Sequence, residues 1–377
     1  MHVLFFCNEY PPYVHGGVGS FDQTLAREVV RSGHRASVIG FYPDLEHESV
    51  EHDRGVHVIR MPVPRSRLPQ AANIRAQQRL WKRVRDVGPD VIEGTELSFW
   101  LRPRSVSAPC VIRLQGGHQF FSRAAQEKPQ RLRGLSERLS FARADGFVGV
   151  SQYVVDETAH HLSYHRKSVA VIPNAIEVDR FAAAEAGSDG DLVFFVGTLC
   201  RKKGVEELID AFAEVLQDRP GLRLALAGRD TTDSRTGASY QQGLQRRMDP
   251  SVAARVEFLG PQPNDVVAQY LARATLTVLP SHMETFGIVW AEAMASGAAL
   301  IASRTGPGPE VVKDGETGLL VDPFDPASIA QAMKRLLDDQ EFSSQLRATA
   351  AEWARSRYSI TELVHVNLDF WSRIRDA

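Results

Sequence analysis

Two glutamates stand eight positions apart in a segment that also carries a glycine suited to anion binding. Glu284 and Glu292 lie in Leu279–Gly297, whose pattern predicts a strand, a loop and a helix. Gly287 near the helix start lets the backbone approach a ligand closely, and the free N–H groups of a first helical turn attract an anion such as a diphosphate. The segment therefore predicts a diphosphate site flanked by two carboxylates that hold hydroxyl groups. The alternative is an ordinary strand-to-helix turn with a solvated glutamate.

A second strand-to-helix loop carries three consecutive cations. The stretch after the predicted strand ending at Gly197 contains Thr198, Arg201, Lys202 and Lys203. A departing diphosphate needs positive groups fixed where negative charge develops, and losing one such contact typically costs about 2.7–4 kcal/mol. Taken alone, these residues would be a solvated loop. Their position after a glycine-ended strand favours a role in binding the diphosphate.

A third glycine-containing loop follows the first predicted strand. It includes Gly16 and Gly17, and glycine lets the backbone approach a ligand closely. The spacing is not G-x-G-x-x-G, and no acidic residue clearly ends the next strand. Both facts argue against a nicotinamide cofactor.

These loops need a scaffold of alternating strands and helices, and the sequence provides that alternation twice. Short apolar or β-branched runs alternate with stretches of helical period, which is typical of parallel sheets in α/β proteins. The predicted strands are 2–8, 36–41, 56–60, 90–92, 110–114, 146–150 and 169–172, then 192–197, 223–227, 256–259, 276–279, 299–302 and 318–321. The main predicted helices are 21–31, 72–87, 151–160, 205–216, 265–272, 286–295 and 326–337.

The best linker candidate is the small, polar stretch 182–190. It divides the chain into a first domain at 1–181 and a second at 191–355. The last segment, 356–377, has apolar residues at helical spacing. We expect it to form a helix that packs back toward the first domain.

Taken together, the three loops resemble family 4 of the retaining glycosyltransferases, which have the GT-B fold of the glycogen-synthase and phosphorylase superfamily. The most specific element is the E-x7-E pattern of Glu284 and Glu292. Val171-Ile172-Pro173-Asn174-Ala175-Ile176 is similar to the family's VIPNG segment, and 306–321 matches as well. The resemblance spans nearly the whole chain. It implies two Rossmann-like doubly wound domains facing across a cleft, with the acceptor bound by the first and a nucleotide sugar by the second.

The resemblance also implies roles for single residues. Glu284 would approach the donor sugar and Glu292 the ribose hydroxyls, while Lys202 and Lys203 would neutralise the diphosphate. Gly16 and Gly17 would close over the reacting centre. The diphosphate would lie against the backbone of Phe286, Gly287, Ile288 and Val289. Transfer would retain the anomeric configuration, with the leaving phosphate accepting the acceptor's proton.

The chain departs from the family pattern at several positions. Thr198 stands where many members have arginine, and Arg201 or Lys202 would substitute for it. Gln115 stands where the usual histidine would fall, so His118 becomes the candidate contact to the donor sugar; the alternative is a satisfied loop histidine. Asp189-Gly190-Asp191 spells the D-x-D metal motif of another glycosyltransferase fold but falls in the predicted linker. Two aspartates alone make a poor magnesium site, so we expect neither a metal nor another cofactor.

Charge and composition bound the remaining possibilities. The chain has 377 residues, no apolar run long enough to cross a bilayer, and three widely spaced cysteines, which favour a reduced cytoplasmic protein without zinc or disulfides. Residues 1–180 carry a net charge of +5 and the remainder −7. Between 60 and 143, 17 basic residues face six acidic ones. That stretch is either a solvated surface or a peripheral contact with anionic lipid at the inner face of the membrane. No reading motif suggests nucleic acid.

The sequence thus predicts a metal-independent, retaining hexosyltransferase. It would use a UDP- or GDP-sugar and act on a glycan, a lipid-linked intermediate or a small molecule. A same-fold nucleotide-sugar 2-epimerase and a catalytically silent nucleotide-sugar-binding protein are the alternatives. The nucleobase, the sugar, the acceptor and the oligomeric state are not encoded in any motif.

Overall fold

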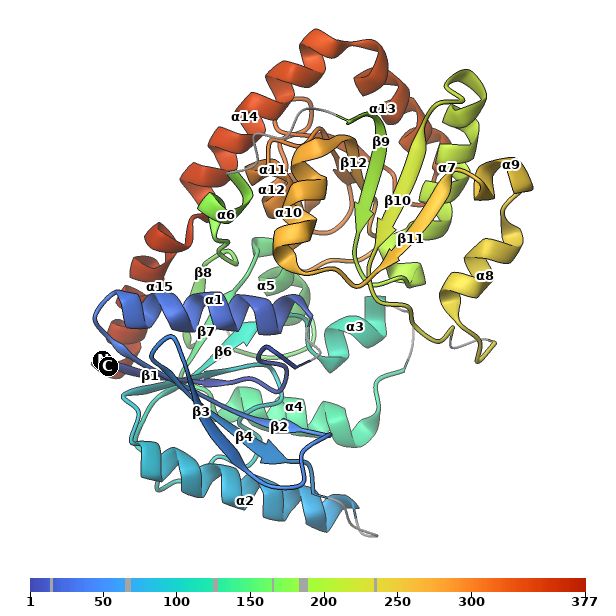
Figure 1. Cartoon of the computed structure of the whole chain (residues 1–377). Coiled ribbons are helices and arrows are strands. Elements are labelled where there is room, and N and C mark those ends of the chain that lie inside the picture. Colours follow the sequence, from blue (N-terminus) through green and yellow to red (C-terminus); the bar gives the residue numbers. More distant parts are fainter. Residues whose placement is uncertain (14–15, 65–68, 125–127, 165, 183–188, 234–235) are drawn as a thin grey trace. The chain divides into compact units, whose positions relative to one another are not determined.

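The computed structural model describes residues 1–13, 16–64, 69–124, 128–164, 166–182, 189–233 and 236–377. These residues form two units, one comprising Met1–Ala175 with Ile360–Ala377 and the other Ile176–Ser359. Figure 1 shows a sheet flanked by helices in each unit. Both sheets are mainly parallel.

The first unit holds eight strands in the order β3-β4-β2-β1-β5-β6-β7-β8, of which only β3 runs antiparallel to its neighbour among the pairs described. Helices α1 and α15 lie on one side of this sheet, and α2 and α4 lie on the other (Figure 1). The strands are β1 (His2–Phe6), β2 (Arg35–Tyr42), β3 (Ser49–Asp53), β4 (Val56–Pro62), β5 (Val91–Gly94), β6 (Cys110–Leu114), β7 (Gly146–Gly149) and β8 (Ser168–Val171). The helices are α1 (Gly17–Arg31), α2 (Pro69–Val87), α3 (His118–Ala124), α4 (Arg131–Arg143), α5 (Gln152–Ala159) and α15 (Ile360–Arg375).

The second unit holds six parallel strands in the order β11-β10-β9-β12-β13-β14. Helices α7 and α13 pack together, as do α11 and α14. The strands are β9 (Asp189–Val196), β10 (Arg223–Ala227), β11 (Val256–Gly260), β12 (Ala274–Leu279), β13 (Leu300–Ser303) and β14 (Leu319–Val321). The helices are α6 (Val178–Ala182), α7 (Val205–Asp218), α8 (Tyr240–Arg247), α9 (Pro250–Ala253), α10 (Asn264–Arg273), α11 (Ile288–Ala295), α12 (Gly308–Val311), α13 (Pro326–Asp338) and α14 (Gln340–Tyr358), with a 3₁₀ turn at Arg201–Lys203.

The C-terminal helix α15 belongs to the first unit because its buried face completes that unit's core. The Trp371 indole packs edge-on against Phe5 of β1, with ring centroids 5.8 Å apart, and donates a hydrogen bond of 2.8 Å to Glu93 of β5. Arg113 of β6 binds the same carboxylate at 2.7 Å. Both Arg113 and Glu93 are buried. An ion pair at that depth persists because each of its charges is compensated by its neighbours.

The structure differs from the expected elements in several places. The mostly polar strand β3 was not expected, because it is a solvated edge strand and lacks the apolar alternation of buried strands. Several helices were also not among those predicted: α3, α4, α6, α8, α9, α12 and α14. Asp189-Gly190-Asp191 lies in β9 and not in a linker, because this stretch joins the sheet beside β12.

The expected linker 182–190 falls largely on residues 183–188, which lie outside the described residues. The division between the units comes earlier, between Ala175 and Ile176, because α6 already packs on α10, α11 and α14. Among the residues that the structure describes, no helix combines the length and the apolar character that crossing a bilayer requires.

Candidate active site

The second unit presents a binding edge where β9 and β12 lie side by side. The chain leaves β9 toward β10 on one side of the sheet order and leaves β12 toward β13 on the other. The loops that follow these two strands therefore diverge from a common point. In doubly wound sheets such a switch point, at the carboxyl ends of the strands, is where ligands bind.

Backbone contacts hold the two loops together. Gly204, which ends the 3₁₀ turn after β9, has a φ of +67°, and a Cβ there would lie 2.1 Å from the carbonyl oxygen of Pro280. Glycine is thus required both for the left-handed conformation and for the close approach. The His282 N–H donates to the Lys202 carbonyl at 2.8 Å. These contacts bring the cationic loop and the glutamate loop to one place.

The principal charged pair of the site joins these loops. The Lys203 ammonium donates to the Glu284 carboxylate, and the side chains are only 21% and 18% exposed. Arg201 and Lys202 are exposed, and Thr198 is half-buried. Of the predicted diphosphate cations, Lys203 is therefore the one that the fold holds beside Glu284.

Helix α11 begins at the same edge with a left-handed glycine. Gly287 has a φ of +83°, and a Cβ there would lie 2.3 Å from Cε3 of Trp290. The Trp290 indole in turn donates to the Leu279 carbonyl at 3.1 Å. The Phe286 side chain is buried against Tyr358. Ile288 and Val289, half-buried, form the first turn of α11.

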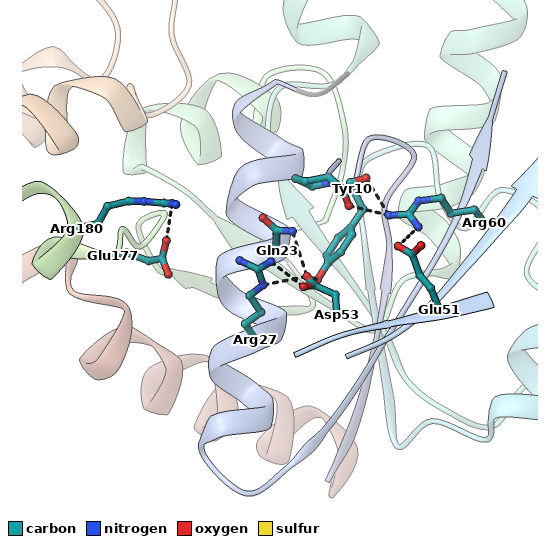
Figure 2. A network of polar contacts seen from close by, with 9 residues as sticks. Tyr10, Gln23, Arg27, Glu51, Asp53, Arg60, Glu177 and Arg180 are labelled. Carbon is teal, nitrogen blue, oxygen red and sulfur yellow. Dashed lines mark hydrogen bonds and ion pairs between the residues drawn. The ribbon is translucent and has the colours of Figure 1, made fainter. Parts of the chain in front are cut away.

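Glu292 lies inside α11, close to an ion pair on and beside α6. Arg180 binds Glu177 at 2.9 Å, as Figure 2 shows, and also Asp265 at 2.7 Å. Burial raises the pKa of Glu292 to about 8; the charge of Arg180 opposes this rise and that of Glu177 adds to it. At neutral pH the free protein therefore carries this carboxyl mainly in its neutral form.

His282 is a site residue that the sequence reasoning missed. Its Nε2 lies 3.2 Å from the Glu207 carboxylate and 3.2 Å from the Pro323 carbonyl, and its ring stacks on Phe324 at 4.3 Å. Burial disfavours ionisation of Glu207, but the polar contact with His282 leads the interactions that lower its pKa overall. The one available signal was the position of His282 two residues before Glu284.

In the first unit, Gly16 and Gly17 lie at the start of α1, and Glu9 occupies the amides there. The Glu9 carboxylate accepts from the Gly16 N–H at 3.2 Å and from the Gly19 N–H at 2.9 Å. A side-chain carboxylate thus caps the helix, which satisfies amides that otherwise lack partners. The structure shows these glycines as the start of a capped helix.

A partly buried network holds the same loop in place. The Asp53 carboxylate accepts from Tyr10, Gln23 and Arg27, at 2.8, 3.1 and 2.7–2.9 Å respectively (Figure 2). The buried Arg60 guanidinium donates to the Pro11 carbonyl at 2.7 Å and pairs with the Glu51 carboxylate. Tyr10 and Pro11, in the loop after β1, are therefore anchored by charged groups from β3 and β4.

His118 and Gln115 lie in the loop after β6. His118 is the first residue of α3, and its Nε2 accepts the Gln130 N–H at 2.8 Å. Gln115 is buried and exchanges side-chain amide hydrogen bonds with Asn174, at 3.2 and 3.4 Å. The structure thus gives both residues partners within the first unit.

The first unit also has a cavity of about 650 Å³ beside the carboxyl ends of β2 and β4. Phe41 and Met61 contribute apolar surface, and Arg75 and Arg79 of α2 contribute charge. This is the edge of a parallel sheet at which ligands bind.

The geometry of the site defines the class of ligand that it can bind. The chain forms two doubly wound units. At its switch point the second unit carries an ammonium–carboxylate pair and a helix that begins at a glycine. This arrangement is suited to bind a phosphorylated ligand with hydroxyl groups.

Two family models match consecutive parts of the chain. Residues 15–180 match the model described as Glycosyltransferase Family 4, and residues 179–353 match Glycosyl transferases group 1. Among curated relatives, the D-inositol 3-phosphate glycosyltransferase of Corynebacterium diphtheriae is 29% identical over 270 residues, which cover 68% of this chain and 62% of the relative. The chain thus spans less than two thirds of that relative's length.

Solved structures share the fold over the whole chain. Sucrose-phosphate synthase from Thermosynechococcus elongatus aligns with a TM-score of 0.84 at 22% identity, covering 99% of this chain and 98% of that one. HepE of Anabaena, solved in complex with UDP-glucose, aligns with a TM-score of 0.79 at 18% identity, covering 99% and 100%. The chain belongs to the family 4 type of glycosyltransferases, with the GT-B fold.

Proposed function

We propose that the protein is a retaining hexosyltransferase that uses a nucleotide diphosphate sugar, UDP- or GDP-linked, and that the donor binds at the β9–β12 edge. The observation that carries this proposal is the Lys203–Glu284 pair beside the glycine-started helix α11. An anion with hydroxyl groups on both flanks matches this arrangement: the ammonium and the helix amides suit the diphosphate, and the two carboxylates suit the hydroxyls.

In the free protein, Lys203 and Glu284 neutralise each other. Leaving either one unpartnered in so enclosed a place would be costly. When a donor binds, the diphosphate pairs with the Lys203 ammonium in place of Glu284. The Glu284 carboxylate is then free to accept hydrogen bonds from the hydroxyl groups of the sugar. Lys202 and Arg201 add charge from the exposed side. Glu292 is assigned to the ribose hydroxyls.

The proposed transfer breaks the bond between the sugar's anomeric carbon and the β-phosphate oxygen, and forms one from that carbon to the acceptor oxygen. The bonding pair leaves with the phosphate, and the acceptor's proton moves to the same departing oxygen. Attack from the face that the phosphate leaves retains the configuration. Positive charge held at the phosphate lowers the barrier. We propose that the cationic loop supplies this charge without a metal ion or another cofactor.

HepE was solved with UDP-glucose, which favours a UDP-sugar over a GDP-sugar as the first donor to test. The experiment is a thermal-shift panel of UDP, GDP, ADP and their glucose or mannose derivatives, in EDTA. A ligand present at 100 times its dissociation constant stabilises the fold by about 2.7 kcal/mol, which is enough to rank the nucleobases.

Three variants make the panel specific. Lys203→Ala should abolish most of the stabilisation by nucleoside diphosphates, and Glu292→Ala should weaken even the nucleoside monophosphate. Lys334→Ala, a lysine on α13 paired with Glu214 and Asp218, is the matched control. If all three proteins respond like wild type, the donor site is elsewhere. Equal stabilisation with magnesium and with EDTA supports metal independence.

Product analysis separates the enzyme from its alternatives. Slow hydrolysis of the donor to free sugar by the pure protein would exclude a silent binding protein. An epimerase would instead return a nucleotide sugar inverted at C2. The anomeric proton coupling of a transfer product, read by NMR, decides between retention and inversion.

We assign the acceptor hydroxyl, on a glycan, a lipid-linked intermediate or a small molecule, to the first unit. Gly16 and Gly17, proposed to close over the reacting centre, and His118, proposed to contact the donor sugar, lie at the carboxyl edge of the same unit's sheet. We further propose a cytoplasmic location, which suits the free cysteines Cys7, Cys110 and Cys200.

We also propose a peripheral contact with anionic lipid through the first unit. Leu132 and Leu135 of α4 are 65% and 55% exposed, and the described basic residues around them are exposed as well: Arg123, Lys128, Arg131, Arg133 and Arg138. Apolar side chains surrounded by cations are typical of helices that lie on anionic membranes. Co-sedimentation with vesicles tests this contact. Binding to anionic but not neutral vesicles, lost in Leu132→Ser/Leu135→Ser, supports it, and equal binding to both vesicle types refutes it.

A further inference from the structure

The loop that carries His118 rests on two buried carboxyl groups, neither of which forms an ion pair with a described residue. Glu96 follows β5 and is 3% exposed, and Glu137 lies on α4 and is 0% exposed. Their burial and position indicate a specific role, because a buried charge is costly unless it is paired.

Gly117 shows how close the two glutamate side chains come to the loop. A Cβ built on Gly117 would lie 1.9 Å from Oε1 of Glu137 and 2.9 Å from Cγ of Glu96. Both side chains therefore lie on the side of Gly117 toward which a Cβ would point. Any residue larger than glycine would have to displace one of them.

The same carboxyl groups bind the amides on either side of Gly117. Glu137 accepts the Gln119 N–H at 3.1 Å. The N–H groups of Gln115 and Gly116 stabilise the charged form of Glu96, and that of His118 stabilises Glu137. The segment Gln115–Gln119 is thus held from below by these two side chains, while Asn174 holds Gln115 by its amide.

The surroundings offer the pair no ion-pair partner among the described residues. The charge of His118 lowers the pKa of Glu137, but burial outweighs it. Each carboxyl has one buried oxygen, Oε1, without a hydrogen-bond partner among the described residues. The other charged and titratable groups on the surrounding elements have partners elsewhere or are exposed. Arg113 pairs with Glu93, Arg102 pairs with Asp145, Arg143 donates to the Trp100 carbonyl, Lys167 donates to carbonyls at the end of α4, and His118 accepts the Gln130 N–H. Four further arginines are exposed: Arg123, Arg131, Arg133 and Arg138. Two adjacent buried carboxylates cannot both stay ionised under these conditions.

We propose that Glu96 and Glu137 share one proton beneath Gln115–Gln119, and that they are positioning residues which keep His118 and the loop around it in place for transfer. The proton supplies a donor between two acceptors that otherwise repel each other. The site assignment of His118 rests on the proposed function; the shared proton and the held loop do not.

Burial agrees with this geometry. It raises the pKa of Glu96 to about 8, an effect to which the charge of Glu137 adds, and it raises the pKa of Glu137 as well. The two groups titrate as a pair, so the proton belongs to both. When the last proton leaves at alkaline pH, two negative charges face each other under the loop, and the loop must move or take up water.

The test is hydrogen exchange, read by mass spectrometry on peptides that cover 115–124 and corrected for the intrinsic pH dependence of exchange. Wild type should protect these amides at pH 7 and lose at least tenfold in protection by pH 9.5. Glu96→Gln and Glu137→Gln each leave only one ionisable carboxyl, so protection should persist at pH 9.5. Glu46→Gln, an exposed carboxyl in the same unit, should behave like wild type.

Activity gives a second, separate measurement. The pH profile of donor hydrolysis should fall on the alkaline side in wild type, and its descending limb should move upward in Glu96→Gln. Unchanged protection of wild type between pH 7 and 9.5 overturns the proposal without any variant. Equal alkaline loss in wild type and in both glutamine variants also overturns it. If the hydrogen-exchange results are as expected but the protein neither binds nor cleaves a donor, the proposed function is wrong and the shared proton remains supported.

Discussion

Replacing Gly287 by alanine tests whether the start of α11 is built around a glycine. Two costs add at this position. A residue with a Cβ loses about 1–2 kcal/mol in the left-handed region, where Gly287 has a φ of +83°. The new methyl would also lie 2.3, 2.6 and 2.9 Å from three atoms of the Trp290 ring. Overpacking of this kind costs about 1–3 kcal/mol.

The Trp290 indole cannot move away from the new methyl group. Trp290 is buried, and its N–H is bound to the Leu279 carbonyl. The helix start must therefore shift, and with it the amides proposed to bind the diphosphate. We expect Gly287→Ala to lose about 2–5 kcal/mol of unfolding free energy in total and to bind UDP at least tenfold more weakly, or about 1.4 kcal/mol.

Gly297, which follows the other end of α11, is a matched control. It has a φ of +65°, but nothing lies within 4 Å of a Cβ built there. Gly297→Ala should therefore show only the backbone cost, about 1–2 kcal/mol, with unchanged UDP affinity. Urea denaturation gives the stabilities, and titration calorimetry with UDP gives the affinities. If Gly287→Ala were as stable as Gly297→Ala, or bound UDP like wild type, the reasoning about the helix start would be wrong.

Three further predictions follow from charges in the two units. The pKa of Glu292 is about 8 in the folded protein, against 4.5 for the free group, so the fold loses stability as pH rises between these values. Glu292→Gln should remove this pH dependence, which amounts to up to about 1.4 kcal/mol of unfolding free energy per pH unit. In urea denaturation, the midpoint of the variant should depend less on pH between 5 and 8 than that of wild type. The free protein carries Glu292 mainly neutral at pH 7, whereas the ribose hydroxyls are proposed to donate to its ionised form, so binding of UDP-glucose should release a proton. Calorimetry in buffers of different ionisation enthalpy measures this release; a binding enthalpy that does not change with the buffer would contradict the ribose assignment. Arg113→Met leaves the buried Glu93 without its cation and should cost about 3–5 kcal/mol in urea denaturation, whereas Arg223→Met at an exposed strand end should cost under 1 kcal/mol.

Much of the fold could be predicted because the signals are local. Cys110–Leu114 and Arg223–Ala227 form strands with the expected bounds, since each is a short run ending in apolar residues between turn residues. The starts of α7 and α13 likewise agree with the prediction. The edge strand β3 and the helix α14 were not predicted because their faces carry few apolar residues. Their places depend on packing partners that no window of the sequence contains.

The proposed donor site is the part of the protein that the sequence determined most fully by itself. Glu284, Gly287 and Glu292 fall within nine residues, so one loop and one helical turn fix their spacing wherever the segment lies. The lysines and their glycine follow the same logic in the preceding βα loop. Such motifs are readable because chain geometry alone relates their members.

Only the tertiary structure decided which charges meet. Lys203 and Glu284 are 81 residues apart and pair because β9 and β12 are neighbours in the sheet. The Glu9 cap on α1, the Trp371 contact with Glu93 and the carboxyl pair under Gly117 likewise join residues that the order of strands and helices brings together. Strand order is set by the burial of whole faces, to which every residue of a unit contributes, so no short stretch of sequence can encode these contacts.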